Sequence, residues 1–600
     1  MPRIVLELPP GLNSDDTTYS AAGRWADGSN VRFWRGKAEA VGGWEAIINT
    51  PLTGVCRKVF GWTDNANNLN IAAGTHSALQ VYQGGALFDI TPFGPPTLLG
   101  NNPLAVTNAS PVVTVTHVAH GLTTGDSVNI SGATTLATIT PNGTFPITVL
   151  TADTYTYTFS SNANNNTSGG GGRVIITPQK ALPAGNIDGT GGAGYGTGTY
   201  STGTWSSPST ADYFPRTWSL SAWGENLIAN PRNGGIFTWT NNTSSRATAI
   251  VTAPTQVTYA LVAPTRQVFA LGCNAEAFPY AFDPLIIRHS SIGNNGEWLT
   301  NLAASTAREY RLPGGGRIVC GAVMGENLLI WTSSALYLGT FVGSLAQPWR
   351  FDKVGDQCGC IGPNAFAVVG QQAMWVGPNL QFYVYTLGSQ PALMPCPIQD
   401  DFADFMAPAQ TDKITMSSVA PFDEVRIDYP DSRDGVECSR YLAAHIPTLM
   451  GSPENAWYRG VMARTAFVDT PPSPNSYPIG VDTSGNMFWH EKGQSANGGP
   501  LSWFIETADN YLDPNSVMQM RGLWPDFKDQ VGPVSVQVIS RFYPQATDYT
   551  VSGQIMGPGQ ERSDVRATGR LAKIRYSASA SPSFARFGNI TIDATPTGRR

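Results

Sequence analysis

Short runs of apolar or alternating residues, separated by turns, recur along most of the chain. Residues 318–324, 328–331 and 335–341 (IVCGAVM, LLIW and ALYLGTF) are such runs, and GEN and TSS separate them. Runs of four to eight residues bounded by turn residues are typical of β-strands. We therefore expect three short antiparallel strands joined by tight turns.

The same pattern occurs earlier in the chain, with a nearly identical sequence at the first turn. WGENLIAN (223–230) and MGENLLIW (324–331) start 101 positions apart, and each lies between two apolar runs. Gly and Asn readily adopt the positive φ that a two-residue hairpin turn requires, and Glu suits a solvent-exposed tip. We interpret both copies as the first hairpin of a repeated unit.

Seven such units can be marked along the sequence, with a spacing of roughly 45 residues, which is the length of one β-propeller blade. They span residues 57–92, 216–241, 266–300, 317–354, 364–397, 413–460 and 461–493. Six to eight blades are compatible with this pattern. A strand from the beginning of the chain often closes such a ring, and we expect VRFW (31–34), within an N-terminal segment 1–56, to do so.

Other parts of the chain differ in composition and in the pattern of apolar residues. The propeller is predicted over 57–103 and 211–500, interrupted by a Thr-rich small β domain (104–182) and by a linker rich in Gly, Thr and Ser (183–210). Longer two-sided strands predict a β-sandwich-like C-terminal domain over 501–600. Only IQDDFADFM (398–406) has a helical pattern, so the predicted fold class is all-β.

Composition agrees with this picture. The 600 residues include 64 Gly and 44 Pro, and only 13% are charged, which is typical of turn-rich β proteins. The net charge of −6 gives no broad basic field for tight sequence-independent binding of nucleic acid. Seven scattered cysteines do not indicate a disulfide framework, and neither a signal peptide nor a membrane span is expected.

Candidate ligand sites are weak. Gly189, Gly191 and Gly194 satisfy GxGxxG, but no strand precedes them and no helix follows, as a dinucleotide fold requires. His117 and His120 lack a third ligand nearby. Cys358 and Cys360 would point to opposite faces if they lay in one strand. We predict no metal site and no cofactor.

Candidate catalytic groups are equally weak. Asp400, Asp401 and Asp404 lie at the start of the expected helix, where solvated acids complement the helix dipole. The run 482–489 (DTSGNMFW) lacks the spacing of a sialidase Asp-box. Aromatic residues can bind sugars, but Trp223, Trp331 and Trp375 fall at expected core positions. We predict no catalytic residue and no enzyme activity.

Three segments resemble a known family. GRWADGSNVRFWRGKAEAVGGWEAI (23–47) looks like the opening of many structural proteins of tailed phages, and GRLAKIRYSASASPSFARFGNITIDATPTGRR (569–600) is similar to their closing segment. HGLTTGDSVNISG (120–132) resembles a module that recurs in phage tail proteins. Together they resemble the tail nozzle, or tail tubular or DNA-stabilisation protein, of short-tailed bacteriophages.

The resemblance implies a structural virion protein of the tail. Six copies would form a ring below the portal and its head-to-tail adaptor, retain the packaged genome, and anchor tail fibres or needle proteins. Genomic DNA would pass through the channel without sequence-specific contact, because a lumen without strong positive charge lets a polyanion slide. Segments 160–172 and 183–210 are candidate gating loops, and Arg24, Arg32, Arg35, Arg599 and Arg600 are candidates for subunit or adaptor contacts or for solvated surface charge.

Two other readings of the sequence stay open. A receptor-binding or glycan-cleaving tail protein would need a pair of carboxylates or an aromatic cleft on one propeller face. A bacterial adhesin would need an export signal.

Overall fold

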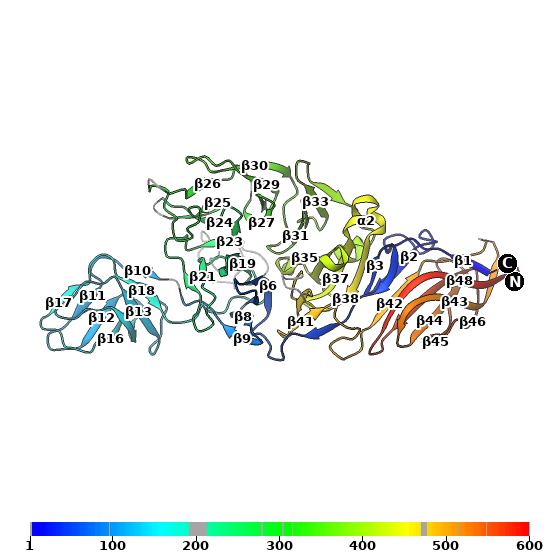
Figure 1. The fold of residues 1–600 in the computed structure, drawn as a ribbon, viewed down its shortest axis with the longest axis horizontal. Helices are drawn as coiled ribbons and strands as arrows, with labels where there is room; N and C mark the ends of the chain where they lie inside the picture. Colours follow the sequence, from blue (N-terminus) through cyan, green and yellow to red (C-terminus); the bar gives the residue numbers. More distant parts are fainter. Residues whose placement is uncertain are drawn as a thin grey trace, which may run out of the picture.

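A computed structural model describes residues 3–94, 96–190, 213–277, 280–302, 305–314, 316–469, 477–513, 515–547 and 549–598. The fold is almost entirely antiparallel β-sheet, which confirms the predicted all-β class. Figure 1 shows three parts in a row: a small domain at one end, a propeller in the middle and a sandwich at the end that holds both termini.

The propeller contains seven four-stranded blades within the described residues. Blades 1 to 4 consist of β6 (Cys56–Thr63), β7 (Leu69–Thr75), β8 (Leu79–Gln83) and β9 (Ala86–Asp89); β19 (Trp218–Trp223), β20 (Asn226–Pro231), β21 (Phe237–Trp239) and β22 (Thr248–Ala249); β23 (Val257–Ala263), β24 (Gln267–Asn274), β25 (Phe282–His289) and β26 (Arg308–Arg311); and β27 (Ile318–Met324), β28 (Asn327–Thr332), β29 (Ala335–Phe341) and β30 (Trp349–Asp356). Blades 5 to 7 consist of β31 (Phe366–Val369), β32 (Gln372–Val376), β33 (Phe382–Thr386) and β34 (Ala392–Met394); β35 (Thr415–Val419), β36 (Glu424–Pro430), β37 (Cys438–His445) and β38 (Trp457–Val461); and β39 (Ala466–Val468), β40 (Ile479–Val481), β41 (Met487–His490) and β5 (Trp44–Ala46).

The first strands of the blades form a closed ring. Each contacts the first strand of the next blade, and β39 of blade 7 contacts β6 of blade 1. The strand that completes blade 7 is β5, which pairs with β41. The expectation that residues 31–34 close the ring is therefore wrong. That segment is β3 (Val31–Trp34), which pairs with β4 (Lys37–Ala40) in the sandwich.

The GGW turn that leads into β5 depends on two glycines without side chains. A Cβ on Gly42 would lie 2.5 Å from a carboxylate oxygen of Glu491, and one on Gly43 would overlap the backbone of Ser495. The chain therefore passes close over residues 491–495, where the nitrogen of Gly43 donates to the carbonyl of Gly493 at 2.9 Å. Only glycine permits this close approach.

The repeated GEN phrase forms the first hairpin of blades 2 and 4, as predicted. Trp223 pairs with Asn226 and Met324 with Asn327. Gly224 and Gly325 have φ of 63° and 61°, the conformation that a two-residue hairpin turn needs at its first central position. The Asn residues instead belong to the following strands, so glycine alone supplies the positive φ.

The small domain lies between blades 1 and 2 in the sequence and has its own hydrophobic core. One sheet contains β10 (Thr97–Leu98), β18 (Ile175–Pro178), β13 (Ser127–Ser131) and β14 (Gly143–Pro146), and the other contains β15 (Thr148–Thr151), β16 (Thr154–Thr158), β12 (Val112–Thr116), β11 (Leu104–Val106) and β17 (Thr167–Gly169). Residues 160–172, expected to be a flexible gating loop, include β17, which pairs with β11.

The sandwich combines both ends of the chain. One sheet contains β3, β4, β48 (Phe584–Gly598), β43 (Val517–Val531) and β46 (Ser563–Gly569), with β1 (Arg3–Leu6) paired to β48; the other contains β2 (Trp25–Ser29), β42 (Trp503–Thr507), β47 (Leu571–Ala578), β44 (Val534–Arg541) and β45 (Thr550–Met556). A single cluster of buried side chains runs from blades 3–6 into this sandwich. Blades 3–6 and the sandwich therefore share one core, while blades 1, 2 and 7 pack in separate clusters.

Helices are few and short. The predicted helix is α1 (Gln399–Phe405). A second helix, α2 (Ile446–Gly451), follows β37 and was not predicted. Turns of 3-10 helix occur as η1 (Pro408–Lys413), η2 (Ala420–Phe422) and η3 (Pro453–Asn455). Over the described ranges, no helix is long and apolar enough to cross a membrane.

Candidate functional site at the junction of propeller and sandwich

The outer strand of blade 6 forms the seam between the propeller and the sandwich. The backbone nitrogen of Asn30 donates to the carbonyl of Arg459 at 3.1 Å, and that of Leu12 donates to the carbonyl of Trp457 at 2.9 Å. The side-chain amide of Asn30 donates to carbonyl oxygens on both sides of the seam, those of Val461 and Ser502. Backbone carbonyls on the edge strand of blade 6 thus accept hydrogen bonds from the N-terminal segment, so this edge is not left unpaired.

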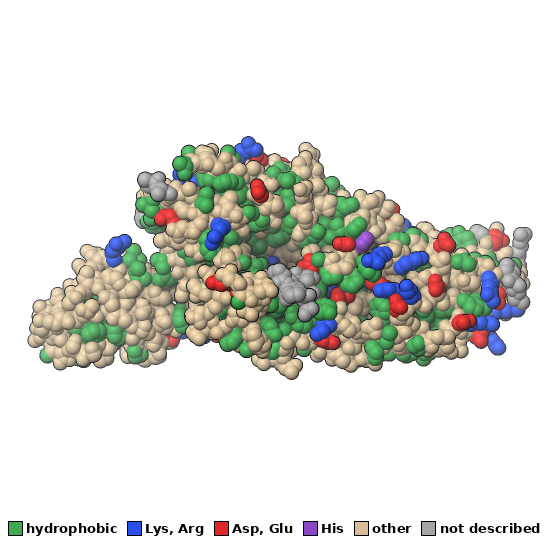
Figure 2. Space-filling model, in the orientation of Figure 1, with side chains coloured by type: hydrophobic (Ala, Val, Ile, Leu, Met, Phe, Trp, Pro, Cys, Tyr) green, Lys and Arg blue, Asp and Glu red, His purple; other side chains and the backbone are tan. Residues whose placement is uncertain are grey.

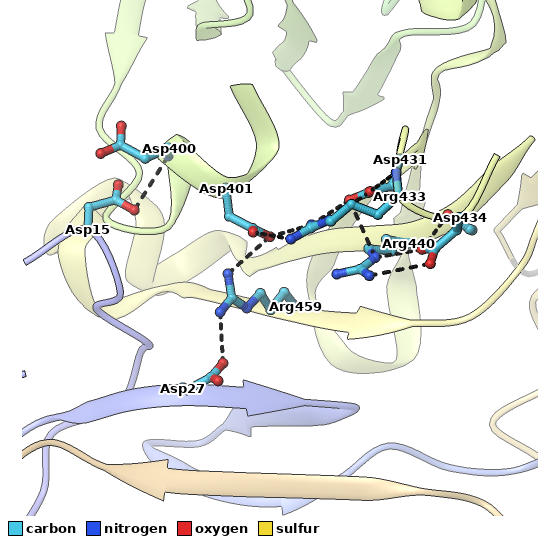
Figure 3. A network of polar contacts seen from close by, with 10 residues as sticks. Asp15, Asp27, Asp400, Asp401, Asp431, Arg433, Asp434, Arg440 and Arg459 are labelled. Atoms are coloured by element: carbon cyan, nitrogen blue, oxygen red, sulfur yellow. Dashed lines mark hydrogen bonds and ion pairs between the residues drawn. The ribbon is translucent and has the colours of Figure 1, made fainter. Parts of the chain in front are cut away.

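A chain of alternating charges crosses this seam (Figure 3). Arg459, on β38, pairs with Asp27 of the sandwich at 2.8 Å and with Asp401 of α1 at 3.2 Å. Arg433 pairs with the same Asp401 through both carboxylate oxygens, at 2.8 and 3.1 Å. One carboxylate therefore joins two arginines from different parts of blade 6.

The chain continues through the loop between β36 and β37. Arg433 donates to both carboxylate oxygens of Asp431 at 2.5 and 2.8 Å, and its guanidinium lies 3.7 Å from the ring centre of Phe405. Arg440 pairs with Asp434 at 2.7 Å and approaches Asp431 at 3.4 Å. Asp431 is fully buried, so these arginines neutralise a charge that water does not reach.

The protonation states of the acids follow from these contacts. Burial raises the pKa of Asp401, but the hydrogen bond from Arg433 and the charge of Arg459 outweigh it, so the pKa lies below its usual value. The hydrogen bond from Arg440 likewise lowers the pKa of Asp434. Both acids are therefore ionised near neutral pH, and neither is suited to donate a proton as a general acid.

The network lines a cleft of about 170 Å³ together with Gly28, Tyr429 and Phe504. Pockets for small molecules usually have volumes of roughly 300–1,000 Å³. The charges that line the cleft already neutralise one another. We therefore interpret the site as a rigid interface between two domains, here called the joint, and not as a ligand pocket.

A second, deeper cluster lies beside this joint. Arg32 is 3% exposed, donates to both carboxylate oxygens of Glu491 at 3.0 and 2.5 Å, and lies 3.5 Å from Glu424. Burial raises the pKa of Glu424 to about 7, although Arg32 and a hydrogen bond from Tyr458 oppose the shift. Arg32 is therefore an internal partner, and both roles considered for it, subunit or adaptor contacts and solvated surface charge, are wrong.

The other arginines considered for such contacts differ in their surroundings. Arg24 donates to the carbonyl of Glu454 at 2.8 Å and to the side chain of Asn455 at 2.7 Å. Arg35 is exposed, with its guanidinium 4.0 Å from the ring centre of Trp34. Arg599 and Arg600 lie outside the described residues.

The predicted role of the acids at α1 needs a correction. Asp400 and Asp401 do lie in the first turn of the helix, and Asp400 and Asp404 are exposed. Asp401, however, belongs to the junction network and is not a solvated dipole-capping acid. The backbone nitrogen of Gln399, at the start of α1, donates to Asp15 at 2.9 Å, so a residue far away in the sequence supplies the cap.

The residues weighed as metal ligands do not converge. The rings of His117 and His120 lie 5.9 Å apart, and both ring nitrogens of His120 contact backbone groups. Cys358 and Cys360 lie in the loop after β30 and not in a strand. Within the described residues, no group of three or more His, Cys, Asp or Glu could hold a metal ion, and all seven cysteines are free and buried.

Other segments considered from the sequence have structural partners. Gly189, of the GxGxxG match, donates its nitrogen to Gln410 at 3.0 Å, while Gly191 and Gly194 lie outside the described residues. The predicted linker 183–210 is described only up to residue 190. Within that part, Asp188 pairs with the buried Lys413 at 2.6 Å. The carboxylate of Asp482 accepts from the backbone of Ser484 and Asn486, so it shapes its own turn.

The tryptophans proposed as core residues are buried to different degrees. Trp331 and Trp375 are fully buried, and their rings meet edge to face at 5.7 Å between blades 4 and 5. Trp223 is only partly buried, against a cluster between blades 2 and 3. The prediction of core positions is therefore confirmed for Trp331 and Trp375, whereas Trp223 lies at the margin of the core.

Comparisons with known proteins add little to this description. No family model and no curated protein matches the chain. Similar solved structures include the phage phi92 endosialidase (12% identity, TM-score 0.18, 70% of this chain and 69% of that chain) and BamB from Moraxella catarrhalis (10%, 0.24, 45% and 80%). Another is BBS1N in complex with ARL6DN (8%, 0.29, 76% and 99%). These similarities are too low to support an argument about function.

Proposed function

We propose that this protein is the tail nozzle of a short-tailed bacteriophage. Six copies form a ring below the portal and its adaptor, and the ring bounds the channel through which the genome leaves. The nozzle retains the packaged DNA before infection and anchors tail fibres or needle proteins. It performs no catalysis.

The observation that carries this proposal is the meeting of the two segments that resemble the family. Residues 23–47 and 569–600 lie at opposite ends of the sequence, but β4 pairs with β48, and β2 and β47 flank β42 in the other sheet. Two segments that resemble the opening and closing parts of one family thus form a single domain. This is what common ancestry with that family would produce.

The shared core suits a mechanical role. Buried side chains continue from blades 3–6 into the sandwich, and the charged network at the seam adds directional contacts. A wall around DNA under pressure must not bend at its domain boundaries. Two domains with one core meet that requirement better than two domains joined by a linker.

The small domain suits an attachment role. It has a separate core and lies at the end of the molecule opposite the sandwich (Figure 1). A module of this kind can carry a fibre or needle contact without disturbing the ring.

The proposal is tested by electron microscopy of the purified full chain, alone and with its adaptor, combined with labelling of the protein on virions. Rings with six-fold symmetry and a label at the tail below the portal are expected. A chain that stays monomeric with the adaptor present, or a label at the fibre tips, would contradict the proposal. Cleavage of host glycans by the purified chain would favour the alternative of a glycan-cleaving tail protein.

A further inference from the structure

The chain that returns from the small domain lies across one end of the propeller ring. Arg57, near the start of β6 in blade 1, and Lys413, just before β35 in blade 6, both contact Glu437. The two first strands therefore begin at the same end of the ring, here called the mouth. Residues 185–190, here called the strap, contact Arg57 and Lys413 and so connect two blades that are not neighbours. Figure 2 shows the molecule hollowed in the middle of the propeller.

Two side chains of the mouth hold the backbone of the strap. The guanidinium of Arg57 donates to the carbonyl oxygen of Ile187 at 2.9 Å. The side-chain amide of Gln410 donates to the carbonyl oxygen of Gly189 and accepts from its nitrogen, both at 3.0 Å. A paired β-strand makes the same double contact with its neighbour. A Cβ on Gly189 would overlap the carbonyl oxygen of Ala409, so only glycine fits beside Gln410.

A third side chain of the mouth, Lys413, holds the carboxylate of the strap. Its ammonium group donates to Asp188 at 2.6 Å and to Glu437 at 2.9 Å, and Arg57 pairs with the same Glu437 at 2.5 Å. Within the described residues, Glu437 and Asp188 are the acids that pair with these two cations. Without the strap, two buried cations would share one carboxylate, so the mouth favours a ligand that brings an acid.

The other charged groups around the mouth do not reverse this balance. Asp412, the neighbour of Lys413 in sequence, pairs with Arg232 at 3.1 Å. Burial lowers the pKa of Lys58 to about 8, so this side chain still carries positive charge at neutral pH. Burial also lowers the pKa of His76, which is therefore neutral. The mouth thus stays positively charged when Asp188 is absent.

The groups that hold the strap belong to the protein interior, whereas the side chains of the strap do not. Arg57, Gln410 and Lys413 are 2, 5 and 2% exposed. Ile187 is 42% exposed, and the side chain of Asp188 is 46% exposed. Buried donors and acceptors with fixed positions form a preorganised site, and they lose little freedom when they bind. A segment that is held by polar contacts and leaves its side chains in water can be exchanged for another of the same chemistry.

We propose that the mouth of the propeller is a binding site for a peptide with an Asp–Gly pair, which the strap occupies in cis and a segment of a partner protein occupies in trans. Arg57 holds the carbonyl oxygen before the Asp, Lys413 holds the carboxylate, and Gln410 holds the backbone of the Gly. The strap therefore blocks the site until it is displaced. The inference goes beyond the proposed function and does not rest on it.

The position of the strap in the chain provides a route for this displacement. The last strand of the small domain, β18, ends at Pro178, and the strap begins at residue 185. The segment between them is tied to the segment that enters the small domain, since the nitrogen of Leu182 donates to the carbonyl of Pro92 at 3.0 Å. A partner that moves the small domain would therefore also pull on the strap.

The test measures binding of a fluorescent synthetic peptide, residues 183–190 (PAGNIDGT), to the full chain by anisotropy. In the wild type the strap competes at an effective concentration of roughly 1 mM, so peptide at much lower concentration should not bind. The variants G189A and D188K release the strap, the first by overlap with Ala409 and the second by repulsion from Lys413. We expect both to bind the peptide. G100A, at a glycine whose Cβ meets open space, should behave as the wild type does.

Two altered peptides test which groups the mouth recognises. A peptide with the change D188N loses the charge-assisted hydrogen bond to Lys413, and one with G189A overlaps Ala409. Each should bind the released variants at least about tenfold more weakly than the original peptide does. Thermal unfolding of every chain variant, with and without peptide, shows that the variant is folded and that the original peptide stabilises it.

The remaining outcomes overturn the inference. If folded G189A and D188K bind no peptide, the strap is a structural segment only. Equal binding of the three peptides would show that the mouth does not recognise the Asp–Gly pair. Binding by the wild type as tight as that by G189A would show that the peptide binds elsewhere. If both release variants unfold, the strap is a part of the fold and not an exchangeable ligand.

Discussion

Glu39 and Arg586 are separated by 547 residues in sequence, yet the guanidinium of Arg586 donates to the carboxylate of Glu39 at 2.8 Å. The two residues lie on β4 and β48, which pair at this position. The first forty residues and the last hundred are therefore one folding unit.

Removal of the N-terminal strands should unfold the sandwich. A chain that lacks residues 3–40 loses β1 to β4 and leaves β48 and β42 with unpaired edges. We expect it to aggregate or to lose the sandwich part of its thermal transition. As a control, replacement of residues 97–178 by a short linker removes a domain with its own core and should leave the remaining transition intact. Equal tolerance of both deletions would contradict the shared sandwich.

Replacement of Arg433 by Ala should destabilise the joint. It leaves the more distant Arg440 as the only cation beside the buried carboxylate of Asp431, which keeps the hydrogen bond from the backbone nitrogen of residue 433, and it removes one of the two arginine partners of Asp401. Because Arg433 is partly exposed, we expect a loss of about 2–3 kcal/mol in the free energy of unfolding, measured in urea. R350A, which breaks the exposed pair with Asp352, should cost less than about 1 kcal/mol. Equal effects would show that the network adds no stability.

Glu424 should make stability depend on pH. Its pKa is raised by burial from 4.5 in the unfolded chain to about 7 in the native protein, so the native state holds a proton that the unfolded state has released. Its contribution is fully present below about pH 4.5 and is lost as the pH rises to 7, by roughly 3 kcal/mol.

The variant E424Q cannot titrate, so its stability relative to the wild type should improve as the pH rises through this range. The difference between the two proteins isolates this residue from the other acids. Parallel profiles of unfolding free energy from pH 4 to 8 would contradict the assignment.

Closure of the propeller should be sensitive to Gly43. A methyl group there would overlap the backbone of Ser495, and relief of that overlap would displace β5 from β41. We expect G43A to lower the free energy of unfolding by about 1–3 kcal/mol. At Gly451 a Cβ meets open space, so G451A should have little effect. If G43A were as stable as G451A, the close approach of the GGW turn would be wrong.

The local elements of this fold follow from the sequence, whereas the pairing between distant segments does not. The GEN hairpins are encoded within eight residues, so their turns and strands can be predicted. Residues 31–34 and 44–46 are both short strands that contain a tryptophan and one charged residue, and no local feature shows which of them pairs with blade 7. That choice depends on β48, more than five hundred residues away.

The residues of the candidate site also could not be predicted from local sequence alone. Asp401 looks like an ordinary acid in the first turn of a helix, because its partners Arg433 and Arg459 come from later parts of blade 6. One signal was present: residues 431–440 contain five charged residues in a chain that is only 13% charged. Such a density within a predicted blade indicates a charged contact, but it does not identify the partner.

The central claim is that this chain forms the wall of a DNA channel as a six-fold ring. Electron microscopy of the full chain with its adaptor tests it most directly. The account predicts closed rings of six subunits around an open channel, located on the virion between the adaptor and the tail tip. Monomers that never close into a ring, or a position on the virion away from the path of the genome, would contradict it.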